Sequence, residues 1–84
     1  NDKKSVKSEN EEIYYSIYAI NNAIYKQEKI KFLYENINKC EEKVISPIRI
    51  FWENDQYYLE GFESSKNNNT SLYHINKIKK AHLK

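Results

Sequence analysis

Two alternating runs of apolar and polar residues, separated by a short polar turn, most constrain what this chain can fold into. The runs cover residues 48–53 and 56–62, and the turn is Asn54-Asp55. Both runs are rich in Ile, Phe, Trp and Tyr, and their alternation has the period of two that a half-buried strand requires. The segment therefore predicts a β-hairpin.

Alternation also assigns the side chains of this hairpin to the two faces of a sheet. On the second strand, Tyr57 and Leu59 share one face and Tyr58 takes the other. On the first strand, Trp52 has the same parity as its aliphatic neighbours, which predicts a packing role in the core or at the sheet edge. Arg49 then lies on the opposite face from Trp52.

Arg49 is the single arginine of the chain, so it is the only residue able to grip a phosphate or carboxylate with two parallel hydrogen bonds. Two roles are open for it. It either contacts a ligand or forms an ion pair on the sheet surface with Glu60 or Glu63.

A helix is predicted upstream of the hairpin, over residues 10–26. Isoleucines recur there at spacings of four, three and four, which is one apolar stripe of an α-helix. They are Ile13, Ile17, Ile20 and Ile24. Such a helix is expected to cover the open face of a sheet, and Ser8 with Glu11 or Glu12 offers capping chemistry at its start. Residues 1–9 lack periodicity and are predicted to be a disordered tail or linker remnant, which leaves 10–84 as the domain.

Three further segments have the period and composition of strands, at residues 29–34, 42–46 and 71–75. The second is expected to end before Pro47, because proline cannot donate to an interior ladder. Residues 64–70 are predicted to be a loop, 76–80 a short helical turn and 81–83 an extended piece. One helix followed by five short strands is an α+β pattern. We expect the antiparallel sheet to close into a small barrel, since closure removes exposed edges.

Composition excludes several classes of protein. A net charge of +2 is too small to argue for nucleic-acid binding by itself. No apolar run approaches the roughly 18 residues that span a bilayer. The single glycine rules out a glycine-rich phosphate loop, and no set of nucleophile, base and acid is apparent, so the chain is not expected to be an enzyme. His74 and His82 have no carboxylate or cysteine at ligand spacing, so neither a metal nor a cofactor is expected.

The single cysteine, Cys40, cannot form an internal disulfide and is expected to lie on the surface. A lone thiol fits a reducing compartment, which predicts a cytoplasmic protein. The chain contains no methionine, even at its first position, so we expect it to be a piece of a longer protein.

An ordered set of motifs resembles the WYL domain, a small Sm-like or SH3-like barrel common in bacterial transcription regulators. The family pattern has a helix, a strand of the form I-x-F-x-Y, a basic residue before a proline, a basic-aliphatic pair, the name-giving tripeptide and a closing aromatic-basic motif. Here these read Ile30-Lys31-Phe32-Leu33-Tyr34, Lys43 before Pro47, Arg49-Ile50, Tyr57-Tyr58-Leu59 and Tyr73-His74-Ile75-Asn76-Lys77-Ile78. The resemblance covers roughly residues 13–83.

The resemblance implies a ligand-sensing module of a bacterial transcriptional regulator, with a helix-turn-helix domain elsewhere in the parent chain. It also implies an anionic small molecule, a nucleotide or single-stranded nucleic acid as the ligand. In this family basic residues lie beside exposed aromatics, so that cations hold phosphates while rings stack on bases. Carried over to this chain, the binding residues are Arg49, Tyr58, His74, Lys77 and Lys43.

The closing motif departs from the family pattern, which has arginine at the positions of His74 and Lys77 and aspartate at that of Asn76. Histidine is mostly neutral near pH 7 and cannot form the bidentate hydrogen bonds that arginine makes to a phosphate, so anions are expected to bind more weakly here. An alternative function remains open. It is protein–protein interaction or homodimerisation without a small ligand, through this same surface or an exposed strand edge.

Overall fold

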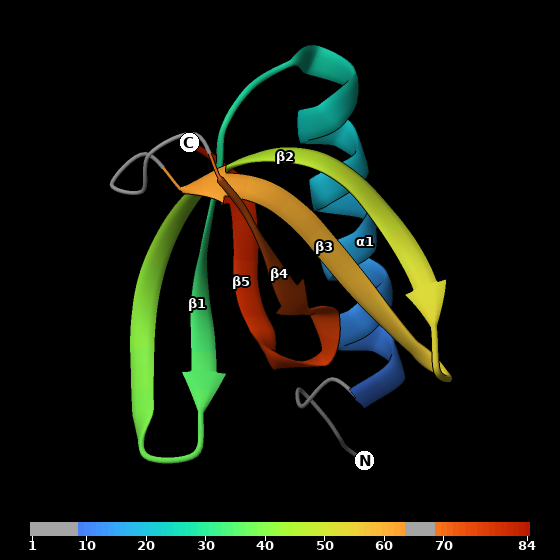
Figure 1. Ribbon diagram of the computed structural model, residues 1–84, viewed down its shortest axis with the longest axis vertical. Helices are drawn as coiled ribbons and strands as arrows, with labels where there is room; N and C mark the ends of the chain where they lie inside the picture. Colours follow the sequence, from blue (N-terminus) through green and yellow to red (C-terminus); the bar gives the residue numbers. More distant parts are fainter. Residues whose placement is uncertain (1–8, 64–68) are drawn as a thin grey trace, which may run out of the picture.

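The computed structural model describes residues 9–63 and 69–84. Within these ranges, one helix accompanies a five-stranded antiparallel sheet of strand order β4-β3-β2-β1-β5 (Figure 1). The α+β prediction is therefore confirmed. In chain order the elements are α1 (Glu9–Lys26), β1 (Ile30–Asn36), β2 (Lys39–Glu53), β3 (Gln56–Glu63), β4 (Thr70–His74), the short 3-10 helix η1 (Ile75–Lys77) and β5 (Ile78–Leu83).

Three predictions fall wholly or mostly on residues outside these ranges. They are the tail over 1–9, the capping role of Ser8 and most of the 64–70 loop. Of the predicted tail only Glu9 is described, and it is the first residue of α1. Among the residues described, no helical segment combines the length and hydropathy that a bilayer crossing requires. Cys40 is exposed on β2, as predicted.

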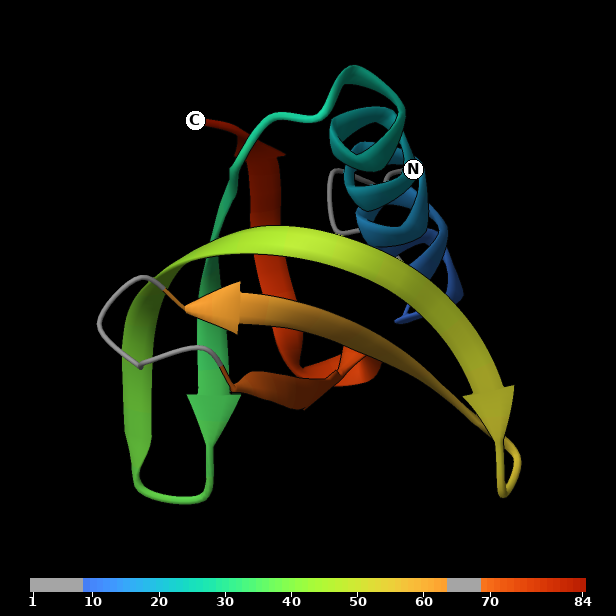
Figure 2. The same cartoon turned by 45° about the horizontal axis from the view of Figure 1, so that its top comes forward.

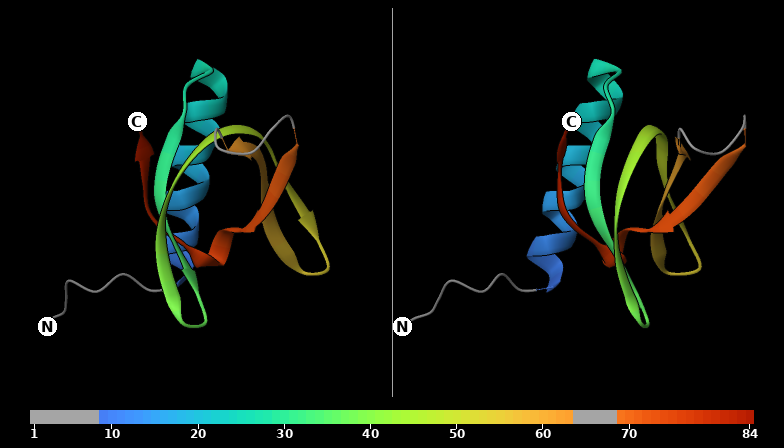
Figure 3. Two further views of the ribbon diagram at one scale, coloured as in Figure 1. Left: turned by 60° about the vertical axis from the view of Figure 1, so that its left-hand side comes forward. Right: turned by 90° about the vertical axis from the view of Figure 1, so that its left-hand side faces the viewer.

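Helix α1 covers the concave side of the sheet with the predicted isoleucine stripe. Ile20 is fully buried, and the other three isoleucines pack against the same core. The buried hydroxyl of Ser16 donates a hydrogen bond of 3.3 Å to the carbonyl oxygen of Ile78, which ties the helix to β5. Figure 3 shows α1 lying along β1 and β5, while β3 and β4 stand beyond the curved β2. The sheet contributes Ile30, Phe32, Ile45, Leu59, Ile75 and Ile78 to this core.

Strand β2 corrects the prediction that a strand ends before Pro47. It passes through Pro47 without a break and joins the two segments predicted at 42–46 and 48–53. The register of β2 on β3 shifts between Pro47 and Arg49, which leaves Ile48 as the extra residue of a β-bulge. A bulge interrupts the ladder locally and bends the strand, so a residue without an N–H is tolerated there. Figure 2 shows the result, a long arch over β3.

Gly61 faces this bend. It pairs with Pro47, and a Cβ added to it would lie 2.5 Å from Cγ2 of Ile45 and 2.8 Å from the carbonyl oxygen of Ser46. Only glycine fits so close an approach of two backbones. Because two of the five predicted strands are one strand, β2, the fifth strand of the sheet is β5. The sequence predicted only a helical turn and a short extended piece in that region.

The predicted closure into a barrel is wrong, because the sheet is open and β4 and β5 are its edges. Strand β1 already pairs with β2 and β5, so its link to the edge strand β4 is made by side chains. The rings of Phe32, Tyr34 and Tyr73 meet edge to face with centroids 5.2 to 6.2 Å apart. The backbone N–H of His74 on β4 donates to the hydroxyl oxygen of Tyr34 on β1 at 3.0 Å. These contacts join β4 to the rest of the core without adding a ladder to the sheet.

Candidate ligand-binding face

Three of the predicted site residues, Arg49, Tyr58 and His74, come together on the convex face of β2, β3 and β4. The register pairs Phe51 with Tyr58, and Tyr58 with His74. Their neighbours Leu59 and Tyr73 are buried, so Tyr58 and His74 point away from the core.

The four side chains form a continuous line, which we call the outer row: Arg49, Phe51, Tyr58 and His74. The guanidinium carbon of Arg49 lies 4.3 Å from the centroid of the Phe51 ring. The rings of Phe51 and Tyr58 stack 5.4 Å apart at 20°, and the imidazole of His74 follows at 4.8 Å from Tyr58. The row therefore presents a cation followed by three rings across three strands.

The bulge in β2 places Arg49 and Phe51 in this row. Ile45 faces the core, so plain alternation along β2 would turn Arg49 toward the core as well. The extra residue, Ile48, reverses the parity, and Arg49 then pairs with Glu60 on the convex face.

The charge of Arg49 is already compensated within the domain. Its Nε donates to Oε1 of Glu60 at 2.6 Å, and the hydroxyl of Thr70 donates to Oε2 of the same carboxylate at 3.0 Å. The hydrogen bond from Arg49, followed by that from Thr70, holds the pKa of Glu60 below its ordinary value. The surface ion pair that the sequence left open for Arg49 is thus present, and an incoming anion has to compete with Glu60.

His74 is held at two points. Its backbone N–H is bound by Tyr34, and its Nδ1 lies 2.7 Å from Oε1 of Gln56. An amide oxygen only accepts hydrogen bonds, so Nδ1 carries the proton in this arrangement and Nε2 of the neutral ring is an acceptor.

Lys43 lies apart from the outer row, on the concave face. Its Nζ contacts Oε2 of Glu63 at 3.3 Å and Oε1 of Glu41 at 3.4 Å, and the hydroxyl of Tyr73 also donates to Glu63 at 3.3 Å. Burial disfavours the charged ammonium, but the hydrogen bonds and charges of the two glutamates outweigh it, so the pKa of Lys43 is raised. Burial, helped by the charge of Glu63, also raises the pKa of Tyr73.

Lys77 also lies outside the row. It is half-buried in η1, and no ion pair involves it within the ranges that the structure describes. Two residues for which the sequence predicted no role, Phe51 and Gln56, contact the candidate residues. Phe51 had the right parity beside Arg49, whereas nothing in the sequence indicated that Gln56 reaches His74.

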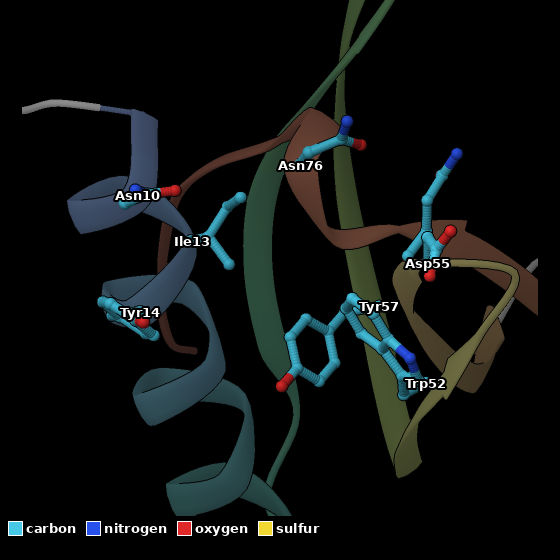
Figure 4. Close-up of a pocket in the computed structure, with 8 residues that line it drawn as sticks. Asn10, Ile13, Tyr14, Trp52, Asp55, Tyr57 and Asn76 are labelled. Atoms are coloured by element: carbon cyan, nitrogen blue, oxygen red, sulfur yellow. The ribbon is translucent and has the colours of Figure 1, made fainter.

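A separate cleft of about 260 Å³ lies between the start of α1 and the tip of the β2–β3 hairpin (Figure 4). Ile13 from α1 and Trp52 and Tyr57 from the hairpin line it, with the amides of Asn10 and Asn76. Trp52 is 57% exposed and meets Tyr57 at 4.6 Å and 67°. Trp52 is therefore not part of the core, and its packing contact is with Tyr57 near the hairpin tip.

Comparison with protein families finds one whose model, described as the WYL domain, matches residues 16–83. The chain belongs to the WYL domain family. The resemblance inferred from the ordered motifs is confirmed, and the matched region of the WYL domain runs from the middle of α1 through β5.

A solved structure of the proteasome accessory factor B/C (PafBC) of Arthrobacter aurescens resembles this WYL domain with a TM-score of 0.78 and 18% sequence identity. The match covers 98% of this chain and 12% of that one, so the domain spans a small part of that protein's length. At this identity the likeness shows the fold alone. Comparison with curated proteins finds no match.

Proposed function

We propose that this WYL domain is the effector-sensing module of a bacterial transcriptional regulator that carries a helix-turn-helix domain elsewhere in its chain. Its effector is a nucleotide or single-stranded nucleic acid, bound on the outer row. The observation that carries the proposal is the row itself, in which a guanidinium and three rings lie in line on an accessible face.

The row favours an effector with bases over a simple anion. Stacking of a base on an aromatic side chain is worth about 1–3 kcal/mol, and it tolerates any base. Because each ring of the row already stacks on its neighbour, we expect a base to extend the stack at its His74 end. Electrostatic attraction contributes less, since Glu60 already compensates Arg49 and Lys43 is engaged with two glutamates. Binding is therefore expected to depend more on the rings than on the cations.

Fluorescence anisotropy with a labelled single-stranded oligonucleotide tests the proposal. With one or two cations meeting phosphates, the slope of log affinity against log salt should lie at about −0.7 to −1.4. Tyr58→Ala should weaken binding about tenfold or more, because it removes the middle ring of the stack that a base would extend. The matched control is Tyr25→Ala, since Tyr25 is 86% exposed on α1 and should leave affinity unchanged. Absence of binding at low salt would rule out a nucleic-acid effector.

A second candidate function, self-association, rests on a different observation. Leu72 is 56% exposed and Phe62 38% exposed, and both lie on the convex face beside Glu60. Leu72 also belongs to the edge strand β4, which could accept a strand from another copy. Sedimentation velocity distinguishes this candidate. A dimer that Leu72→Lys dissociates supports it, and a monomer at high concentration rules it out.

A further inference from the structure

The cleft between α1 and the hairpin tip differs chemically from the outer row. Figure 4 shows Ile13 on α1 facing Tyr57 across it, with Trp52 beside Tyr57. Its volume of about 260 Å³ is slightly below the roughly 300–1,000 Å³ of pockets for drug-sized ligands. A compact head group fits such a space better than an extended chain does.

Two aromatic rings form a corner of this cleft. Trp52 and Tyr57 meet at 67°, and they remain 57% and 40% exposed, respectively, although both are large and partly apolar. The core does not need them, because Leu59 and Ile50 from the same strands fill it. The two rings meet edge to face, and the ring faces that stay exposed carry the negative potential that attracts a cation.

The charged and polar residues around the cleft also favour a cation over an anion. The lining includes the acidic residue Asp55 and the neutral polar residues Asn10 and Asn76, whereas no lysine, arginine or histidine of the described residues lines it. Glu11 and Glu12 in the first turn of α1 offset the positive end of the helix dipole there. Glu12 is also paired with Lys79, whose Nζ lies 3.3 Å from its Oε1.

We propose that this cleft binds a small organic ammonium ion. The alkylated nitrogen rests on the corner formed by Trp52 and Tyr57, Asp55 balances its charge, and its aliphatic part contacts Ile13. This site shares no residue with the outer row, so it does not depend on the effector proposed above. Gln56 lies between the two, because it lines the cleft and also contacts His74 of the row.

The intrinsic fluorescence of Trp52 can be used to test the proposal. Trp52 is the only tryptophan, so its fluorescence reports occupancy of the cleft directly. We would titrate the whole chain at constant ionic strength with choline and, in parallel, with 3,3-dimethyl-1-butanol, which has the same shape without the charge. Choline should saturate the signal at about tenfold lower concentration than the neutral alcohol, the factor that two cation–π contacts on exposed rings are expected to supply.

Substitutions distinguish the contributions of the carboxylate and of the rings to choline binding. Asp55→Asn should lower choline affinity about two- to fivefold and leave that of the neutral alcohol unchanged. Asp55 has φ 63°, a conformation that asparagine tolerates well, so this change should leave the turn intact. Tyr57→Leu should lower choline affinity about fivefold. Arg49→Ala is the control and should have no effect on choline, because Arg49 lies outside the cleft.

Equal affinities for choline and the neutral alcohol would overturn the proposal, and so would a fluorescence signal that does not saturate with choline. Loss of oligonucleotide binding in Arg49→Ala with choline binding intact would confirm that the two sites are independent.

Discussion

The contact between Tyr34 and His74 can be tested by removing a single oxygen atom. Tyr34→Phe keeps the ring that packs on Phe32 and Tyr73 but deletes the hydroxyl that accepts the N–H of His74 at 3.0 Å. A buried donor left without its acceptor costs about 1–3 kcal/mol. Tyr34 is 8% exposed while the bond itself is partly buried, so we expect the lower half of that range, about 1–2 kcal/mol.

Urea unfolding followed by far-UV circular dichroism measures this loss. The midpoint should fall at an unchanged m-value, since the same surface is exposed on unfolding. The melting temperature should drop by about 4–8 °C for each kcal/mol in a domain of this size. The matched control is Tyr25→Phe, which changes an exposed hydroxyl on α1 and should alter stability by less than about 0.5 kcal/mol.

Hydrogen exchange at the His74 amide gives an independent readout. Without the Tyr34 acceptor this amide should exchange faster, while amides in the middle of β1 and β2 change only with global stability. If Tyr34→Phe is as stable as the Tyr25→Phe control and the His74 amide keeps its protection, aromatic packing alone joins β1 to β4. A stabilising role for the Tyr34 hydroxyl would then be refuted.

Three further predictions concern the outer row and the concave face. Glu60→Gln removes the carboxylate that competes with a ligand for Arg49, so oligonucleotide affinity should rise. The slope of log affinity against log salt should become steeper by about 0.7, and an unchanged slope would show that Arg49 does not contact a phosphate. His74→Arg should strengthen anion binding because it adds a forked cation to the row, and calorimetry showing equal affinity would mean that this position does not reach the ligand. Folding raises the pKa of Tyr73, chiefly by burial, so the unfolded chain loses this proton first and stability should fall as pH rises beyond about 10. Tyr73→Phe should make the alkaline part of a stability–pH profile flatter, and an identical profile would contradict the assignment.

Local patterns predicted the elements of this domain well. The isoleucine spacing identified α1, since one buried stripe on a helix is a property of a short stretch of sequence. Alternation within the hairpin correctly separated Leu59 from Tyr58 and Arg49 from Trp52, because parity along one strand needs no knowledge of its neighbours. The ordered motifs identified the family because each of them is a short segment that can be read without knowing the fold.

Features that depend on pairing between distant segments are not predictable in this way. Proline chemistry predicts a strand end at Pro47, but the bulge beside it and the close approach of Gly61 let β2 continue. Only the register, which places Glu60 opposite Arg49, reveals the ion pair of that arginine. The family motif groups Lys43 with the other cations, although it lies on the other face of the sheet.

The sequence by itself thus determined the kind of domain, its helix and its hairpin, and it supplied candidate residues for the binding face that we propose. The tertiary structure alone decided that the sheet stays open, that Arg49 is compensated, and that a second cleft lies between α1 and the hairpin. The physical reason is that periodicity and propensity act over a few residues. Register, bulges and side-chain contacts across the sheet depend on how segments far apart in the chain fill one shared core.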